Sequence, residues 1–345
     1  MCIRDSKIAD SSWDKLYPCL LHRLEKTGKL NGYYQWGKRL LISIDGTRFF
    51  SSKKIHCPCC LTQKDKKGQV TYGHGLLSAV VVCPERQAVF PMAHEPLSKQ
   101  DGETKNDCEL NAVKKLLVKL QTHYSDKKFL FVEDALYANA PHIEQLLAMD
   151  AQHIIGVKPE SHTCLFSQVK RAAQTGKLKT KVLTNSKKQV QEIYRYVPNL
   201  RLNQAHNIRL NGVSERWENG KRTPLFTWIT NRNVSVRNVD KIAQMGRSRW
   251  KIENETFNTL KNQSYKFEHN YGHGKQFLAH NFALLMLLVF LADQIQQACC
   301  RHFQQAWKCS KTKVKLWERI RAIIALIPVQ NMTQCLLILI QKKQT

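Results

Sequence analysis

Two short apolar runs, each ending in a carboxylate, constrain the fold of this chain more than any other feature. The first, RLLISID, spans residues 39–45, and the second, KFLFVED, spans residues 128–134. Continuous runs of this length, rich in β-branched or aromatic residues, are typical of buried strands. We expect the first strand to end at Asp45 and to open into a turn at Gly46, which would place its carboxylate at the edge of a cleft. Asp134 closes the second run in the same way.

The segments around these runs predict an alternation of strands and helices. Residues 76–82 and 88–92 are strand candidates at hairpin spacing. Apolar residues at intervals of three and four predict a helix over 108–124. A short helix around Ile143 and a strand over 153–157 follow. The predicted order is three strands, helix, strand, helix, strand.

The pattern changes between residues 179 and 230, where polar and apolar residues alternate in short pieces. Asn-Gly pairs at 211–212 and 219–220 are typical of hairpin turns, so this block is predicted to be an inserted β-rich subdomain. Helical periodicity returns over residues 236–263 and 277–300.

These changes of pattern suggest four parts of the chain. Residues 1–6, MCIRDS, resemble translated sequencing-adapter sequence, and we expect the native N-terminus to be missing. The predicted parts are an N-terminal segment (1–38), a core (39–178 and 231–300), an inserted β-rich subdomain (179–230) and a C-terminal helical segment (301–345).

The charge of the chain points to a polyanionic partner. Lys and Arg number 54 against 27 Asp and Glu, which gives a formal net charge of +27. A compact body with this charge repels itself unless a polyanion lies against it, and the excess is spread along the chain. We therefore expect nucleic acid as the partner, against the alternative of a generally solvated basic surface.

The cysteine content and the apolar runs bear on the compartment. Twelve cysteines in 345 residues are too sparse for a disulfide scaffold, and no signal peptide precedes them. The longest apolar run, residues 282–292, is well short of the roughly 20 residues that span a bilayer. We expect a reducing cytoplasmic compartment and no membrane segment.

A third acid is expected on the helix predicted near residue 250. At about 100° per residue, Arg249, Glu253 and Lys261 share one helical face, whereas Glu255 points away from it. Arg249 has a planar fork for a phosphate and Lys261 a point charge. The alternative is an ordinary surface Arg-Glu pair at four-residue spacing.

Three acids from separate segments predict a metal centre. Two strand-end carboxylates, Asp45 and Asp134, joined by Glu253 form an oxygen cage of the kind that hard divalent cations prefer. Two such ions roughly 3.5–4 Å apart activate the attacking oxygen and stabilise the leaving oxygen in phosphodiester cleavage. In this scheme Asp45 bridges both ions, and the other two acids each complete one side.

Three motifs around these acids resemble those of DDE transposases of the insertion-sequence type. They are IDGT at 44–47, EDALYANAP at 133–141 and RWKIENETFNTLKN at 249–262, in the same order, and the resemblance covers roughly residues 39–290. The resemblance implies an RNase H-like α/β fold, a mixed sheet flanked by helices, with an inserted β-rich subdomain and a helical C-terminus.

The resemblance also implies the activity and the partners. A member of this family cleaves double-stranded DNA at element ends and transfers the strand into target DNA. It uses two Mg²⁺ (or Mn²⁺) ions and acts as a homodimer on DNA in the prokaryotic cytoplasm, associated with the nucleoid. Two alternatives are an inactive DNA-binding remnant of a transposase and an RNase H-like nuclease that cuts without strand transfer.

The last motif departs from the family pattern at two places. In the branch with a β-rich insertion it runs Tyr, two residues, Arg, three residues, Glu, six residues, Lys. Arg249 and Glu253 keep the family's spacing here, but Gly246 stands at the Tyr position. Seven residues, rather than six, lie between Glu253 and Lys261. The DNA-binding role that the resemblance implies for Lys261 is therefore an open question.

Tryptophans of the inserted block are candidates for base stacking. Members of this branch place a Trp from the insertion against an unpaired base, and Trp228 and Trp217 lie in the corresponding block. The alternative for Trp228, which lies in the apolar run LFTWI, is a buried core position.

A Cys-x-x-Cys motif after the first predicted strand suggests a structural zinc site. Cys57 and Cys60 with His74 would supply three ligands, and Cys108 or His94 the fourth. A single motif of this kind equally fits reduced, unligated thiols. Zinc at this place would stabilise the loop rather than take part in hydrolysis.

Polar residues at the start of the predicted helix near 108 are assigned no catalytic role. This stretch, residues 107–109, includes Asp107, which fits a helix cap.

Overall fold

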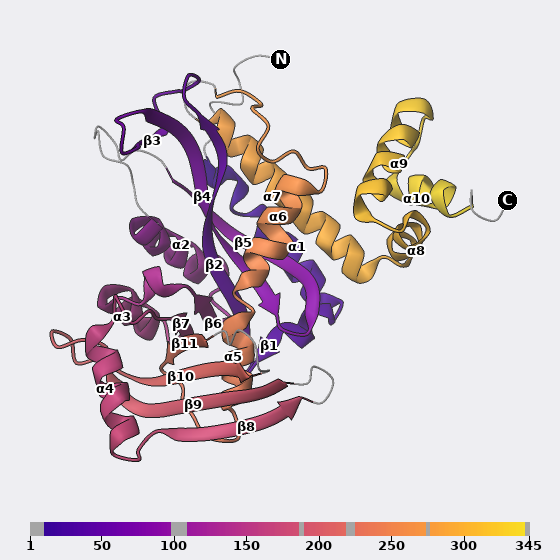
Figure 1. The fold of residues 1–345 in the computed structure, drawn as a ribbon. Coiled ribbons are helices and arrows are strands. Elements are labelled where there is room, and N and C mark those ends of the chain that lie inside the picture. The colour runs from indigo at the N-terminus through magenta and orange to yellow at the C-terminus, as the bar shows by residue number, and fades with distance from the viewer. Residues whose placement is uncertain (1–9, 98–108, 186–189, 219–224, 274–276, 342–345) are drawn as a thin grey trace.

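A computed structural model describes residues 10–97, 109–185, 190–218, 225–273 and 277–341 of the chain. The strands in these ranges form one mixed sheet of eleven strands in the order β3-β4-β2-β6-β7-β11-β10-β9-β8, with β1 beside β2 and β5 beside β4. Helices cover both faces of this sheet (Figure 1). The predicted α/β fold, a mixed sheet flanked by helices with a helical C-terminus, is confirmed.

Five strands form the centre of the sheet. They are β2 (Arg39–Ser52), β4 (Val70–Cys83), β5 (Arg86–Leu97), β6 (Lys128–Glu133) and β7 (Gln152–Gly156). The pairs β2–β4 and β4–β5 are antiparallel, whereas β2–β6 and β6–β7 are parallel. Two short strands, β1 (Tyr34–Gln35) and β3 (Leu61–Lys64), pair with β2 and β4.

Strand β2 is longer than the sequence indicates. It continues past Asp45 to Ser52 because β4 pairs with it along this length, with Asp45 opposite Ser78. The predicted turn at Gly46 is therefore wrong. Asp45 lies in the middle of a long strand. The second half of this strand pairs with β4 on one side only.

The inserted block extends the same sheet. Its strands are β8 (Lys179–Asn185), β9 (Val190–Arg201), β10 (Arg209–Glu218) and β11 (Leu225–Thr230). They join the centre because β11 pairs antiparallel with β7. Asn211-Gly212 lies within β10, where the register with β9 shifts, so the predicted hairpin turn there is wrong. The second Asn-Gly pair, 219–220, lies outside the described residues.

Two hydrophobic cores lie on the two faces of the sheet. Alternate residues of β2 point into different cores, Leu40 and Ile42 into one and Leu41 into the other. The first core is covered by α1 (Leu16–Lys26), α2 (Glu109–His123), α3 (Ala140–Ala148) and α4 (Thr163–Gln174). The second is covered by α5 (Val239–Arg247), a π-helix (Ile252–Phe257), α6 (Asn258–Asn262) and α7 (Leu278–Cys299). Three 3₁₀ turns complete the core, Asp10–Trp13, Lys29–Tyr33 and Ala135–Tyr137.

Helix α7 is long and apolar enough to cross a membrane by length and composition alone. In the structure it packs against β5 and α1, and Ala283 and Leu287 are buried in the second core. Its Asp293 is also buried and accepts a hydrogen bond from the Tyr265 hydroxyl. This packing is that of a core helix.

The C-terminal helices form a small core of their own. They are α8 (Arg301–Ser310), α9 (Lys313–Leu326) and α10 (Met332–Gln341), packed around Phe303, Leu316 and Leu336. Figure 1 shows them standing beyond the C-terminal end of α7, apart from the sheet.

Candidate active site

Two of the predicted acids lie on neighbouring parallel strands. In the β2–β6 register Ser43 pairs with Val132, so Asp45 and Asp134 each follow that pair by two residues. Asp134 directly follows β6 and caps the 3₁₀ turn after it, with its Oδ1 accepting from the Leu136 amide at 2.8 Å. Both carboxylates are partly exposed.

The neighbouring acid Glu133 has a different environment. Its side chain is buried, and its Oε2 lies 2.9 Å from Nε2 of His142 on α3. Because successive residues of a strand point to opposite faces, Asp134 faces away from this pair. Of the two acids that close the KFLFVED run, Asp134 therefore belongs to the candidate site.

The third acid lies on an irregular helical segment. The single helix predicted over 236–263 is divided, because α5 ends at Arg247 and Ile252–Phe257 is a π-helix. Single π-turns within helices often occur at functional sites. Glu253 lies at the start of this turn and is exposed. Glu255 instead influences Lys313, at the start of α9: burial lowers the pKa of this lysine, and the charge of Glu255 opposes that shift.

Electrostatics link the three acids. Burial raises the pKa of the Asp45 carboxyl, and the negative charges of Asp134 and Glu253 raise it further, while Arg249 opposes them. The β2–β6 register and the contacts of Arg249 with β2 bring the same three segments together.

Arg249 forms an ion pair with the first acid. Its Nη1 lies 2.9 Å from Oδ2 of Asp45, while Oδ1 accepts from the Gly46 amide at 2.9 Å. The Ser43 hydroxyl donates to the Arg249 carbonyl at 3.1 Å. These contacts attach the segment before Glu253 to β2.

A fourth carboxylate, Glu109, to which the sequence analysis assigned no catalytic role, lies beside this cluster. Burial raises the pKa of Glu109, and so do the charges of Asp45 and Asp134. Glu109 begins α2, and a Cβ at Gly46 would lie 2.5 Å from its Oε1. The Tyr137 hydroxyl donates to its Oε2 at 3.4 Å. Two features of the sequence could have indicated this neighbour: Glu109 is an acid at the start of a predicted helix, and Gly46, directly after Asp45, leaves space for another side chain.

The match to a known family agrees with this geometry. Residues 36–291, most of the chain, match the transposase DDE domain family. The chain belongs to the DDE transposase family. No curated protein matches the chain. The matched range contains Asp45, Asp134 and Glu253, and the family implies DNA as the partner of this transposase.

Two residues of the last motif have partners within the transposase itself. Lys261 lies on α6 and pairs with Glu268 at 3.1 Å. Gly246, at the family's Tyr position, leaves the space that the Trp228 ring fills, because a Cβ there would lie 2.6 Å from that ring.

The tryptophans of the inserted block lie at different depths. Trp228 on β11 is 6% exposed and stacks on Phe226, so the structure places it in the core, as in the second of the two alternatives. Trp217 on β10 is partly exposed, with its ring under Arg247 and its indole N–H donating to Glu215 at 2.8 Å.

The Cys-x-x-Cys residues of the transposase meet two histidines. Cys57, Cys60 and His74 gather with His273, and their ligand atoms all lie within 4.8 Å of one another. Of the two fourth ligands proposed from the sequence, Cys108 lies outside the described residues. His94 is buried elsewhere, with its Nδ1 2.8 Å from the Ser78 hydroxyl, so that proposal is wrong. Sequence reasoning missed His273 because 199 positions separate it from His74.

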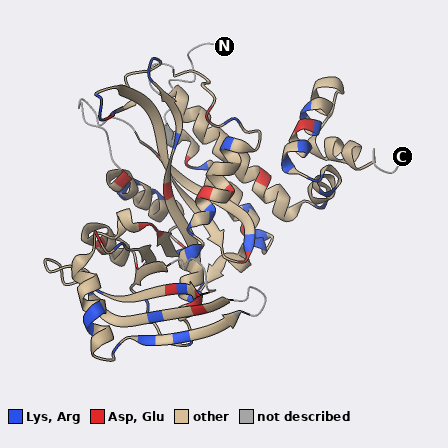
Figure 2. Cartoon of the chain, in the orientation of Figure 1, with Lys and Arg blue, Asp and Glu red and all other residues tan. Residues whose placement is uncertain are grey.

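Basic residues lie on several parts of the transposase. Figure 2 shows Lys and Arg on the inserted strands, on α4 and on the C-terminal helices. This distribution agrees with the spread of positive charge along the sequence, and it is suited to contacts with an extended polyanion.

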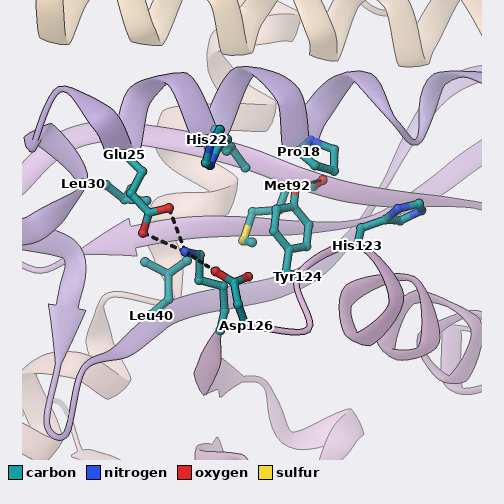
Figure 3. Close-up of a pocket in the computed structure, with 11 residues that line it drawn as sticks. Pro18, His22, Glu25, Leu30, Leu40, Met92, His123, Tyr124 and Asp126 are labelled. Carbon is teal, nitrogen blue, oxygen red and sulfur yellow. Dashed lines mark hydrogen bonds and ion pairs between the residues drawn. The ribbon is translucent and has the colours of Figure 1, made fainter.

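A cavity of about 230 Å³ lies away from the acids. Its lining includes Glu25 of α1, Leu40 at the start of β2 and Lys127 just before β6, and Figure 3 shows Glu25 and Leu40 facing it. Asp45 and Asp134 lie further along the same two strands, toward their carboxyl ends. The cavity is therefore at the opposite edge of the central sheet and is not part of the candidate active site.

Proposed function

We propose that this transposase cuts DNA at the ends of an insertion sequence and joins the freed ends to target DNA, using Asp45, Asp134 and Glu253 as its catalytic acids. The observation that carries this proposal is the placement of the acids: the β2–β6 register sets Asp45 beside Asp134, and the contacts of Arg249 with β2 bring the segment of Glu253 to the same place. Carboxylates gathered from distant segments repel one another, and a bound divalent cation offsets this repulsion.

The donors at this place fit divalent metal ions. All are carboxylates, which Mg²⁺ prefers, and they are partly or fully exposed. Among the described residues the one ion-pair partner of Asp45 is Arg249, so the cluster keeps an excess of negative charge. Asp45, Asp134 and Glu253 would hold two Mg²⁺ (or Mn²⁺) ions. Such ions supply activation of the attacking oxygen and stabilisation of the leaving oxygen.

The basic residues beside the acids are proposed to hold the DNA backbone. Arg249 has one guanidinium nitrogen on Asp45, and its other donors are suited to a phosphate next to that acid. Lys261 is paired with Glu268, whose side chain is 59% exposed, so a phosphate can replace this partner. We do not assign Trp228 to base stacking because it is buried. Its partly exposed neighbour Trp217 is better placed for that role.

The reaction has two balanced steps. In the first, a water oxygen attacks the phosphorus at the element end, the bond to the 3′ oxygen breaks, and a 3′ hydroxyl and a 5′ phosphate result. In the second, that hydroxyl attacks a phosphodiester of target DNA, a new bond joins the strands, and the target's 3′ oxygen leaves with the proton.

Partners follow from charge and from the need to cut two ends. The net charge of +27 suits double-stranded DNA at both the element ends and the target. Two ends and one acid cluster per chain favour a homodimer on DNA. We place this reaction in the prokaryotic cytoplasm, on the nucleoid.

The test uses a supercoiled plasmid that contains the DNA flanking the reading frame on both sides. With Mg²⁺ the purified protein should nick this plasmid, and Asp45→Ala should abolish nicking while the gel shift of the same DNA is retained. Glu318→Ala, at an exposed acid of α9 in the C-terminal helices, is the matched control and should cut normally. Unchanged nicking by Asp45→Ala overturns the proposal.

The same assays separate the two alternatives. An inactive remnant would shift the plasmid without cutting it, although the presence of all three acids argues against this. A nuclease of the same fold would cut but would not join a labelled end fragment to a second plasmid.

A further inference from the structure

Four side chains capable of binding a soft metal meet beside the β2–β4 hairpin. Cys57 and Cys60 lie in the loop after β2, His74 lies on β4, and His273 lies between α6 and α7. The loop is folded as a tight turn, in which the Cys60 amide donates to the Cys57 carbonyl at 3.1 Å. The Cys57 amide donates to Sγ of Cys60 at 3.3 Å, so both thiols point to the same side.

Five of the six distances between these atoms are close to the edges of a tetrahedron around zinc, and the sixth, from Cys57 Sγ to His273 Nδ1, is within 4.8 Å. With Zn–S near 2.3 Å and Zn–N near 2.0–2.1 Å, the edges are about 3.8 Å for S···S, about 3.6 Å for S···N and about 3.3 Å for N···N. The two Sγ atoms of Cys57 and Cys60 lie 3.6 Å apart, and His74 Nε2 lies 3.3 Å from each of them. His273 Nδ1 lies 3.1 Å from His74 Nε2 and 3.9 Å from Cys60 Sγ.

The kind and burial of the donors select zinc over magnesium. Two thiols and two imidazoles are soft or intermediate ligands, which favour Zn²⁺ in tetrahedral sites, whereas Mg²⁺ requires oxygen. Cys57, Cys60 and His74 are buried. The sulfur atoms are also too far apart for a disulfide, whose S–S bond is about 2.05 Å.

Aromatic packing fixes the two imidazoles before any ion binds. Phe49 stacks on the His74 ring at 5.9 Å and 15°, and Phe50 meets the His273 ring edge-on at 4.3 Å and 79°. Both phenylalanines belong to β2. Ligands held by packing in this way lose little freedom on binding, which strengthens a metal site.

From these observations we propose that Cys57, Cys60, His74 and His273 bind one Zn²⁺ that is structural. Four protein ligands fill a tetrahedral site and leave no position for water or substrate. The ion would join the β2–β4 hairpin to the segment between α6 and α7, which follows the helical turn of Glu253 along the chain. The proposal is independent of DNA cleavage, because the site uses none of the three acids.

Metal analysis of the purified protein tests this proposal. Wild-type protein grown with zinc should contain about one zinc per chain, the count that one four-ligand site allows. Cys57→Ser and His273→Ala should each retain less than roughly a tenth of that, because a missing ligand typically lowers zinc affinity by far more than the 10- to 100-fold caused by loss of an outer-shell partner.

Each variant has a neighbouring control. Cys59→Ser changes the third thiol of the same loop, and His269→Ala changes an exposed histidine of the same segment. Both should keep full zinc content. Full zinc content in Cys57→Ser or His273→Ala, or loss in both controls, overturns the proposed ligand set.

A second measurement needs no variant and therefore does not depend on their folding. Wild-type protein stripped of zinc and titrated with Co²⁺ should develop the intense ligand-field bands of tetrahedral cobalt with thiolate ligands, saturating near one equivalent. Zinc should then bleach them. Weak bands typical of octahedral oxygen coordination, or no bands at all, would overturn the site even if the plasmid assay succeeded.

Discussion

The two candidate metal sites of this transposase lie on the same pair of strands and differ in nearly every chemical respect. Asp45 pairs with Ser78 on β4, and a few residues further along β2 Phe50 pairs with His74. The first place gathers carboxylates that are partly or fully exposed, and the second gathers thiols and imidazoles that are mostly buried. The neighbourhood of one strand pair thus contains hard oxygen ligands that are exposed to solvent and soft sulfur and nitrogen ligands that are mostly buried.

The electrostatic balance of the two places also differs. At the acids, burial raises the pKa of Asp45 and of Glu109, and the charges of neighbouring carboxylates raise both further, while Arg249 lowers that of Asp45. The ionised carboxylates therefore repel one another. At the Cys/His cluster the donors contact one another and pack on aromatic rings. An exchangeable ion suits the first place and a permanent one the second. The following experiments test that distinction.

The largest effect should come from the third acid. Glu253→Gln removes a ligand charge with almost no change of shape, and loss of several kcal/mol of transition-state stabilisation corresponds to about a thousandfold slower cleavage. Glu255→Gln, two residues away on the same π-helix, should cut within about twofold of wild type, the scale of a surface substitution. Initial nicking rates of the plasmid measure both.

Zinc content measured on the same two samples makes the comparison sharp. It should stay at the wild-type level in both, since neither glutamate belongs to the Cys/His cluster. Slow cutting by Glu255→Gln with normal cutting by Glu253→Gln would show that the helical turn faces the other way.

The next effect should come from removal of the buried ion. A ligand at about 100 times its Kd stabilises the folded state by roughly 2.7 kcal/mol, which corresponds to about 4 °C in Tm for a chain of this length. Stripping zinc should therefore lower the Tm by this amount, and Cys60→Ser should do the same, whereas Cys59→Ser should not. Thermal unfolding measures it, and recovery of Tm on adding Mg²⁺ instead of Zn²⁺ would contradict the division between the sites.

The acid site should respond to mild acid. Because the pKa of Asp45 is raised, this carboxyl takes up a proton at a higher pH than an ordinary aspartate, and a bound proton competes with a cation. At limiting Mg²⁺, cleavage should fall about tenfold per pH unit below the inflection, as for one competing proton. Higher Mg²⁺ should move the inflection to lower pH. An inflection that ignores Mg²⁺, or one that follows zinc release measured in parallel, would refute this explanation.

Local patterns predicted the parts of the fold and site that local interactions determine. Asp45 and Asp134 were chosen from the sequence because each follows a buried apolar run, and such runs are recognisable within a few residues. The choice of Glu253 came from regular helical geometry, yet the structure has a π-turn at Ile252–Phe257. The assignment of Glu253 to one helical face assumed about 100° per residue, which is the geometry of an α-helix and not of this π-helical segment.

The remaining features depend on partners far away in the chain. The length of β2 follows from its ladder with β4, and the bulge at Gly212 follows from pairing with β9, although an Asn-Gly pair alone is typical of a turn. His273 joins the Cys/His cluster and Glu109 joins the acids only through tertiary packing. No spacing within the sequence indicates such neighbours.

The smallest effect is expected at Glu109, and it concerns the folding cost of the acid cluster. Burial and two like charges raise its pKa, so the folded state favours the protonated form and loses stability as the pH rises through that value. Glu109→Gln keeps the size of the side chain and an oxygen for the Tyr137 hydroxyl but removes the charge. In magnesium-free buffer at neutral pH the Tm should rise by about 1–3 °C, the shift expected for roughly 1 kcal/mol or less in a chain of this size. The gain should shrink in Mg²⁺, which relieves the same repulsion, and Glu160→Gln, at an exposed acid, should show none. A lower Tm for Glu109→Gln without Mg²⁺ would mean that the fourth carboxylate stabilises the fold, and the contrast between a self-repelling acid site and a self-supporting Cys/His site would not hold.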